Sequence, residues 1–342
     1  MKTFDDVAAW LRSKPGRVRV TGSGSRTPTL PVAPEATTLD LSQHNRIERL
    51  DAGDQTCTIE CGVPRSELDA ALLEHDLELP CLGDGTIGGL FATDPFGAAA
   101  AGYPGPRNLL LGMHALLADG TSFKAGARVV KSVAGFDVHK LLVGSSGRLF
   151  IATRLHLRLK PRPRAEQWFA NRELERDLAL QLLHALRSEA EPPTVLQLRR
   201  ERDGSFAVCG RVTGRSVHTT ALCKRHRLVA CERPSNFHVE SAVNSGEEVL
   251  TGNALPSALP ALLSALPDGA PLVWLGGGRF ETATPNCPAT DAALEAMPQA
   301  NISATVLLGA DRRRGRSTPT DPGEQRLADG LKHALDPDGI LV

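Results

Sequence analysis

The sequence predicts an α+β protein of two domains. Its 342 residues exceed the roughly 250–300 residues at which a single hydrophobic core stops growing. Segments with the alternating pattern of strands are mixed with segments that have helical spacing. The proline-rich run 161-PRPR-164 separates two such regions, so we expect one domain over residues 1–162 and a C-terminal α/β domain over residues 163–342.

Short strands and helices fill the first region. Residues 4–11 place apolar side chains on one helical face, and Thr3 and Asp6 hold the positions of a capping box. In the segment 148–161, Ile151 and the apolar residues after it alternate with charged ones, which predicts a strand with one buried and one solvent-facing side. Further strands are expected at 17–21, 37–41, 46–51, 55–62 and twice within 112–126, with a helix at 65–76.

The second region also mixes the two kinds of element. Residues 172–191 have the spacing of a long amphipathic helix, and residues 217–228 predict a second one. Strands are expected at 194–200, 205–214 and 272–277, the last of which ends at three glycines. An α+β second domain follows from this mixture.

Charge and composition exclude several classes of protein. Lys plus Arg equals Asp plus Glu at 39 each, so the basic excess of a broad nucleic-acid surface is absent, and 312-RRRGR-316 is interpreted as a solvated loop. No stretch approaches the roughly 18 apolar residues of a membrane span. The acidic N-terminus does not resemble a signal peptide, and an odd number of cysteines, seven, indicates reduced thiols in the cytoplasm.

Two glycine loops, 22-GSGS-25 and 83-GDGTIGG-89, suggest an anion site. Each can present backbone amides without side-chain obstruction, and two such loops facing each other would enclose a pyrophosphate. A Rossmann fingerprint is not matched because Thr27 occupies the place of its third glycine, and 126-GARVVKS-132 lacks the second glycine of a phosphate loop. Two unrelated turns remain the alternative.

A longer motif follows the second loop. The run 128-RVVKSVAGFDVHKLLVGSSGRLFIATRLHLRLKP-161 is similar to the K-N-V-A-G-Y-D-L-x-x-L-x-x-G-S-x-G-T-L-G-V-I-T segment of flavoproteins with the vanillyl-alcohol-oxidase, or PCMH, type of FAD-binding domain. With both glycine loops and 331-LKHALDPDGIL-341, the chain resembles most closely the FAD-binding subunit of glycolate oxidases. The resemblance implies a PCMH-type domain of two α/β subdomains, followed by an α/β cap.

The resemblance also implies which residues hold the cofactor. It implies that the first loop contacts the FAD diphosphate from one side, that the second loop contacts it from the other, and that a turn–helix–turn lies next to the flavin. Because the first loop has no histidine, we expect non-covalent FAD. The residues implied are Gly22, Ser23, Gly24, Ser25, Thr86, Ile87, Gly88, Gly89, Gly135, Asp137, Gly144, Ser145, Gly147 and Ile151.

The chain departs from the family pattern beside these residues. Arg148 and Phe150 replace the usual Thr and Gly, and Arg154 stands where the family commonly has Glu. Ser132 and Phe136 replace Asn and Tyr. These changes bear on how tightly a flavin is held.

Catalytic and metal-ligating residues are sparse. Arg279 follows three glycines, and its guanidinium could hold a substrate carboxylate in a bidentate way, although a surface arginine is the alternative. The series Cys223, His226, Cys231 and His238 has mixed zinc ligands, but its spacing matches no standard finger. We therefore expect no metal site.

The resemblance implies an FAD-dependent oxidoreductase that works as a subunit. A larger FAD-containing subunit would oxidise a 2-hydroxy acid such as glycolate to glyoxylate, and an iron–sulfur subunit would take the electrons onward. The expected location is the cytoplasm, with attachment to the inner membrane only through partners. Two alternatives stay open: a self-sufficient flavin oxidoreductase, and a flavin-free scaffold, which Arg148 and Arg154 favour.

Overall fold

The chain folds into two compact units. The computed structural model describes residues 3–13, 16–25, 35–81, 83–93, 101–103, 105–128, 136–233, 246–308, 317–318 and 321–342. The first unit comprises Met1–Pro95, Pro104–Arg162 and Asp321–Val342, and the second comprises Phe96–Tyr103 and Pro163–Thr320. One boundary between the units falls after Arg162. Residues 321–342 belong to the first unit, so a single boundary at 162/163 does not describe the division.

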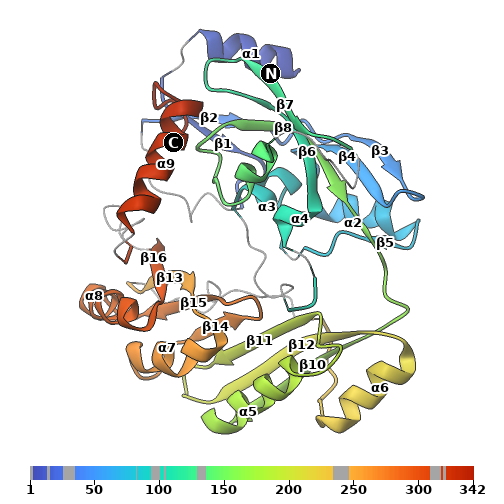
Figure 1. Ribbon diagram of the computed structural model, residues 1–342, viewed down its shortest axis with the longest axis vertical. Helices are drawn as coiled ribbons and strands as arrows, with labels where there is room; N and C mark the ends of the chain where they lie inside the picture. The colour runs from blue at the N-terminus through green and yellow to red at the C-terminus, as the bar shows by residue number, and fades with distance from the viewer. Residues whose placement is uncertain are drawn as a thin grey trace. The chain divides into compact units, whose positions relative to one another are not determined.

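A five-stranded antiparallel sheet organises the first unit, in the order β3-β4-β8-β6-β7 (Figure 1). The sheet strands are β3 (Ile47–Asp51), β4 (Thr56–Glu60), β6 (Leu110–Leu116), β7 (Ser122–Gly126) and β8 (Ile151–Arg158). Outside the sheet lie α1 (Phe4–Arg12), α2 (Arg65–Leu73), α3 (Ile87–Thr93), α4 (Pro106–Leu109), the 3-10 helix η3 (Val138–Leu142), α9 (Pro322–Leu335), and the short pair β5 (Leu77–Glu78) and β9 (Lys160–Pro161).

Helix α1 begins as the sequence predicts. The Thr3 hydroxyl accepts a hydrogen bond from the Asp6 amide, and the Asp6 carboxylate accepts one from the Thr3 amide, which completes the capping box. The apolar face of the helix packs on the end of the sheet in one buried cluster that includes Val7, Leu11 and Ile151.

The alternation along β8 is interrupted by a bulge, which the sequence pattern did not predict. His114 pairs with Arg154, but the next residue of β6, Ala115, pairs with Ala152, so Thr153 is the extra residue. A bulge of one residue exchanges the two faces of a strand. As a result Ile151 and Arg154 lie on the same side of the sheet, although they stand at opposite positions of a period-two pattern.

The C-terminus completes a smaller sheet in the same unit. Strands β1 (Val18–Thr21) and β2 (Thr37–Asp40) pair in parallel, and Leu341 forms a parallel bridge to Val18 on the other side of β1. The Val18 amide donates to the Ile340 carbonyl at 2.7 Å, and the Val342 amide donates to the Val18 carbonyl at 3.0 Å. These bonds explain why the last residues belong with the N-terminal ones.

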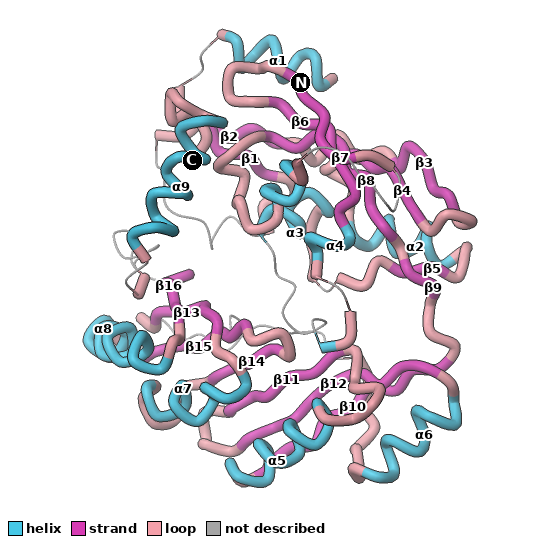
Figure 2. The backbone as a smooth tube through the Cα atoms, in the orientation of Figure 1, coloured by secondary structure: helices cyan, strands magenta, loops and turns pink. Residues whose placement is uncertain are grey.

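The second unit is a seven-stranded antiparallel sheet, in the order β10-β12-β11-β14-β15-β13-β16 (Figure 2). One hydrophobic core joins it to its helices. The elements are β10 (Ala165–Leu174), α5 (Arg176–Arg187), β11 (Val195–Arg200), β12 (Phe206–Gly214), α6 (Ser216–Arg225), β13 (Glu248–Asn253), η5 (Pro256–Ala258), α7 (Leu259–Ala265), β14 (Leu272–Leu275), β15 (Arg279–Thr284), α8 (Cys287–Ala296), η6 (Met297–Ala300) and β16 (Ser303–Leu308).

Helix α5 starts later than the sequence indicates. The helical spacing suggested a start at residue 172, but Leu174 still pairs with Phe206 in the ladder between β10 and β12. The helix begins at Arg176 instead. Pairing with a neighbouring strand overrides the local helical preference there.

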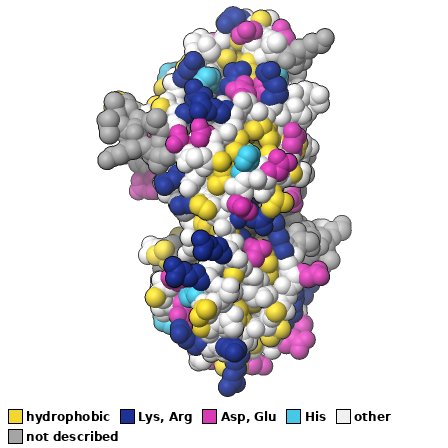
Figure 3. Space-filling model, turned by 90° about the vertical axis from the view of Figure 1, so that its right-hand side faces the viewer, with side chains coloured by type: hydrophobic (Ala, Val, Ile, Leu, Met, Phe, Trp, Pro, Cys, Tyr) yellow, Lys and Arg dark blue, Asp and Glu magenta, His cyan; other side chains and the backbone are white. Residues whose placement is uncertain are grey.

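Surface features agree with the balanced charge. On the face drawn in Figure 3, basic and acidic side chains are interspersed. Among the described residues, none of the helices has the length and apolar composition that crossing a membrane requires.

Candidate functional site

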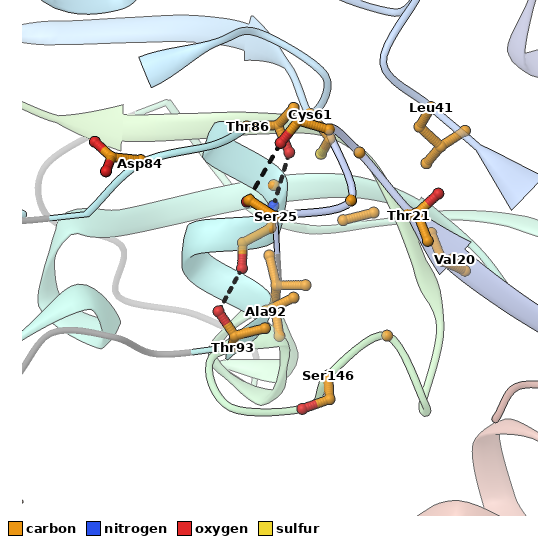
Figure 4. A pocket seen from close by; sticks show the side chains of 18 of the residues that line it. Val20, Thr21, Ser25, Leu41, Cys61, Asp84, Thr86, Ala92, Thr93 and Ser146 are labelled. Carbon is orange, nitrogen blue, oxygen red and sulfur yellow. Dashed lines mark hydrogen bonds between the residues drawn. The ribbon is translucent and has the colours of Figure 1, made fainter. Parts of the chain in front are cut away.

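Three segments of the first unit surround one cavity (Figure 4). The loop 22–25 follows β1, the residues 84–93 include α3, and the turn 144–147 follows η3. The space between the atoms that line the cavity is roughly 730 Å³, part of it open to solvent. Its lining consists of Val20, Thr21, Gly22, Ser23, Gly24, Ser25, Leu41, Cys61, Asp84, Thr86, Gly88, Gly89, Ala92, Thr93, Leu142, Ser146, Gly147, Phe150 and Ala152.

The two glycine loops lie against each other, as the sequence predicted for an anion site. A Cβ atom on Gly22 would lie 2.1 Å from the Thr86 hydroxyl oxygen, and one on Gly85 would lie 2.5 Å from the Ser25 hydroxyl oxygen. Gly85 also has a φ of +92°, which side chains rarely adopt. The loops can approach this closely only because both positions are glycine.

The third segment is fixed to the other two. The Ser146 amide donates to the Ala92 carbonyl at 2.8 Å, at the end of α3. Gly147, with a φ of +74°, packs beside Val20 of β1. Ser146 therefore lies on a separate turn from Ser25 and Thr86, as the labelled side chains in Figure 4 show.

The amides of the second loop do not all face the cavity. The Ile87 amide donates to the Val63 carbonyl at 2.9 Å, and the Gly88 amide donates to the Cys61 carbonyl at 2.8 Å. A Cβ on Gly88 would lie 2.6 Å from the Cys61 Cβ. The contacts present in the structure thus give Gly88 a packing role against the end of β4, and Ile87 is buried.

The other predicted residues of this unit are distributed around the cavity. Gly144 and Ser145 lie in the turn but do not line the cavity, and Ile151 packs in the core beneath α1. Asp137 is exposed and pairs with Lys140 at 2.5 Å. Gly135 lies outside the described residues.

Sequence reasoning missed the apolar wall of the cavity. Phe150 is fully buried and meets the Phe123 ring edge-on, with 5.6 Å between the ring centroids. Cys61 and Leu41 come from segments on either side of β3 and β4 and carry no motif. The one available signal was position, because Phe150 and Ala152 lie directly after the turn 144–147.

Among the residues that the structure describes, few charged groups line the cavity. Asp84 is an acidic lining residue, and it is exposed to solvent. Burial raises the pKa of the Cys61 thiol well above its ordinary value, so this lining cysteine stays protonated and a poor nucleophile.

The remaining candidates lie in the second unit. Arg279 begins β15 and is half-buried, beside Asn253 in the strand pairing. His226 Nε2 lies 2.6 Å from a Glu189 carboxylate oxygen, and Cys223 packs against the core. His238 lies outside the described residues.

The residues present fit a dinucleotide with a diphosphate. Glycines bring two loops together at one end of the cavity, and the hydroxyl groups of Ser23, Ser25 and Thr86 lie at that end. Apolar residues such as Leu142 and Phe150 form another part of the cavity wall. Loops with small side chains favour a phosphate, and apolar walls favour a flat ring.

Comparison with known proteins supports the same type of site. Residues 2–126 match a family described as FAD binding domain. Over 42% of its length the chain is 33% identical to a D-lactate dehydrogenase of Archaeoglobus fulgidus, which it covers to 32%. Over 42% of its length it is 32% identical to glycolate oxidase subunit GlcE of Escherichia coli, which it covers to 41%. The chain thus spans less than half the length of these curated relatives.

The fold has a solved counterpart. Over 98% of the chain and 74% of the other protein, the structure superposes on an alkyldihydroxyacetonephosphate synthase with a TM-score of 0.70. The sequence identity is 13%, so the likeness concerns the fold.

Proposed function

Because this chain carries a PCMH-type FAD-binding domain of the FAD-dependent oxidoreductases, with FAD as cofactor, we propose that it is the FAD-binding subunit of a complex that oxidises a 2-hydroxy acid. The observation that carries the proposal is the cavity between the two glycine loops and the turn 144–147. The 2-hydroxy acid follows from the names of the two relatives, because glycolate and D-lactate both belong to that class.

Each wall of the cavity has a separate task in this proposal. The loop 22–25 and Thr86 bind the diphosphate through hydroxyl groups and backbone amides, and the glycines let both loops reach it. Phe150 and Leu142 exclude water from the ring system. Bound FAD supplies the acceptor for the two electrons of substrate oxidation.

We propose that the cofactor is held without a covalent bond. Among the described residues, the one thiol that lines the cavity is Cys61, which burial keeps protonated. The loop 22–25 contains no histidine. Binding therefore depends on the shape of the cavity and on its hydrogen bonds.

A charge placed in the first loop tests the binding site. We expect Ser25→Asp to weaken FAD binding by at least about tenfold, because a carboxylate would face the diphosphate. Ser25→Asn is the matched control, since it has nearly the same shape without the charge, and it should bind FAD more tightly than Ser25→Asp. The measurement is a titration of the purified chain with FAD, followed by flavin absorbance. Equal affinities for the two variants would contradict a diphosphate at this loop.

We propose further that the chain works with a larger flavin subunit and an iron–sulfur subunit. The support is the likeness to a protein named as a glycolate oxidase subunit. The same proposal includes a cytoplasmic location, supported by seven cysteines that are all free. Purification of the tagged chain from its own cells should recover both partners, and turnover of glycolate or D-lactate by the isolated chain would favour a self-sufficient enzyme instead.

A flavin-free scaffold is the second candidate. The observation in its favour is the Phe150 side chain, which lines the cavity where the family pattern has a glycine. A purified chain that stays colourless and does not retain added FAD would support this candidate and contradict the first.

A further inference from the structure

The ammonium group of Lys332 joins three separate parts of the first unit. It donates to the Arg148 carbonyl at 2.8 Å and to the Leu341 carbonyl at 2.7 Å, and it also contacts the Asp336 carboxylate. A lysine ammonium has three donor hydrogens, and these contacts use all of them. The side chain is only 28% exposed, so solvent does not replace these bonds readily.

One of these contacts leads to the cavity. Arg148 follows Ser146 and Gly147, which line the cavity, and the Arg148 amide closes the same turn on the Ser145 carbonyl at 3.0 Å. The bond from Lys332 therefore fixes the end of the turn that forms one wall.

The other two contacts lead to the strand that precedes the loop 22–25. The Asp336 carboxylate is buried and accepts from the amides of Ile340 at 2.9 Å and Leu341 at 2.8 Å, which shapes the C-terminal segment. That segment pairs with Val18 of β1, and β1 runs directly into the loop 22–25. A single ammonium thus connects the supports of both the glycine loop and the turn.

From these contacts we infer that Lys332 is a positioning residue for the cofactor: it holds the turn 145–148 at a fixed place relative to the loop 22–25 and thereby sets the affinity for FAD. It does not line the cavity and needs no contact with the cofactor. This inference rests on the proposed function, because it concerns the same cavity.

The test compares variants of the full chain. Lys332→Met removes the ammonium and keeps most of the volume, and Lys332→Arg keeps the charge and several donors. Lys332→Met with Asp336→Asn removes the buried carboxylate's charge as well, and it serves if the single variant fails to fold. Lys160→Met is the matched control, because Lys160 is a partly exposed lysine of the same unit that does not line the cavity. FAD affinity is measured by titration, and amide hydrogen exchange is measured without FAD.

The expected result has three parts. Lys332→Met binds FAD at least about tenfold more weakly than the wild-type chain, Lys332→Arg recovers part of the loss, and Lys160→Met binds as the wild type does. Exchange accelerates at residues 145–148, whereas residues 206–214 of β12 in the second unit keep their rate. The charge-neutral double variant shows the same weakened binding.

Two results would overturn the inference alone, and a third would overturn the proposed function as well. Wild-type affinity in Lys332→Met, with a wild-type chain that binds FAD, would remove the positioning role and leave the proposed function standing. Acceleration in residues 206–214 equal to that in residues 145–148 would show general destabilisation. A wild-type chain that does not retain FAD would overturn the proposed function, and the inference with it.

Discussion

Replacing Gly22 with alanine is expected to lower the free energy of unfolding by about 1–3 kcal/mol and to weaken FAD binding by at least about tenfold. The added Cβ would lie 2.1 Å from the Thr86 hydroxyl oxygen, 2.8 Å from its methyl carbon and 2.9 Å from its Cβ. Threonine is branched at Cβ and has few rotamers with which to move aside. The loop 22–25 must therefore separate from α3, which widens the cavity where the diphosphate is proposed to lie.

Urea denaturation and FAD titration of the purified variant measure both effects. Gly330→Ala is the matched control: a Cβ on Gly330, in the exposed α9, meets nothing within 4 Å, so alanine should raise stability by about 0.5–1 kcal/mol and leave FAD binding unchanged. The double variant Gly22→Ala/Thr86→Ala should lose less stability than the two single losses together, because it removes two of the three clashing atoms. Strict additivity would mean that the loops do not meet at these two residues.

Acidification is expected to destabilise the first unit between pH 6.5 and pH 4.5. Burial, with a smaller contribution from the neighbouring His114, lowers the pKa of His156 to about 4, and the ring lies 3.0 Å from the Thr58 hydroxyl through Nδ1. Burial also lowers the pKa values of His44, His114 and His139. The fold therefore favours neutral histidines on and beside this sheet.

The direction of the effect follows from proton binding. The unfolded chain takes up protons on histidine below about pH 6.5, whereas folded His156 stays neutral until about pH 4. Stability is thus complete above pH 6.5 and is lost as the pH falls, by about 2 kcal/mol from His156 alone between pH 6.5 and pH 4.5. Urea denaturation at several pH values measures this slope.

Variants separate this effect from general acid denaturation. His156→Gln cannot take up the proton, so its free energy of unfolding should depend less steeply on pH in this window, even though the variant is less stable at neutral pH. His333→Gln, on the exposed side of α9, is measured alongside as the control variant. If His156→Gln keeps the wild-type slope, protonation of this buried ring is not what destabilises the fold.

Much of the candidate site could be predicted from local sequence. The glycines at 22, 24, 88 and 89 and the motif from Gly144 to Gly147 could be recognised in the sequence. In the structure, Gly22 and Gly88 lie too close to Thr86 and Cys61 for a Cβ atom, whereas Gly24, Gly144 and Gly147 have positive φ angles. The capping box at Thr3 and the hairpin of β3 and β4 were equally readable, since their signals lie within a few neighbouring residues.

Tertiary structure decided what these residues do. Both positions are glycine, yet Gly88 packs against Cys61 and Gly22 packs against Thr86. The bulge at Thr153 depends on how β8 pairs with β6, and it puts Ile151 and Arg154 on the same side of the sheet, with the Ile151 side chain in the core beneath α1. Pairing between strands is set by distant segments, so the period of one strand cannot reveal it.

The sequence by itself determined that the chain has glycine loops suited to a diphosphate and a family motif that implies FAD. Only the tertiary structure brought the C-terminal segment onto β1 and placed Lys332 against the carbonyl of Arg148, which is 184 positions away in the chain. The physical reason is that a motif constrains the backbone within a few residues, whereas hydrogen bonds between distant segments exist only after the chain has closed around its core.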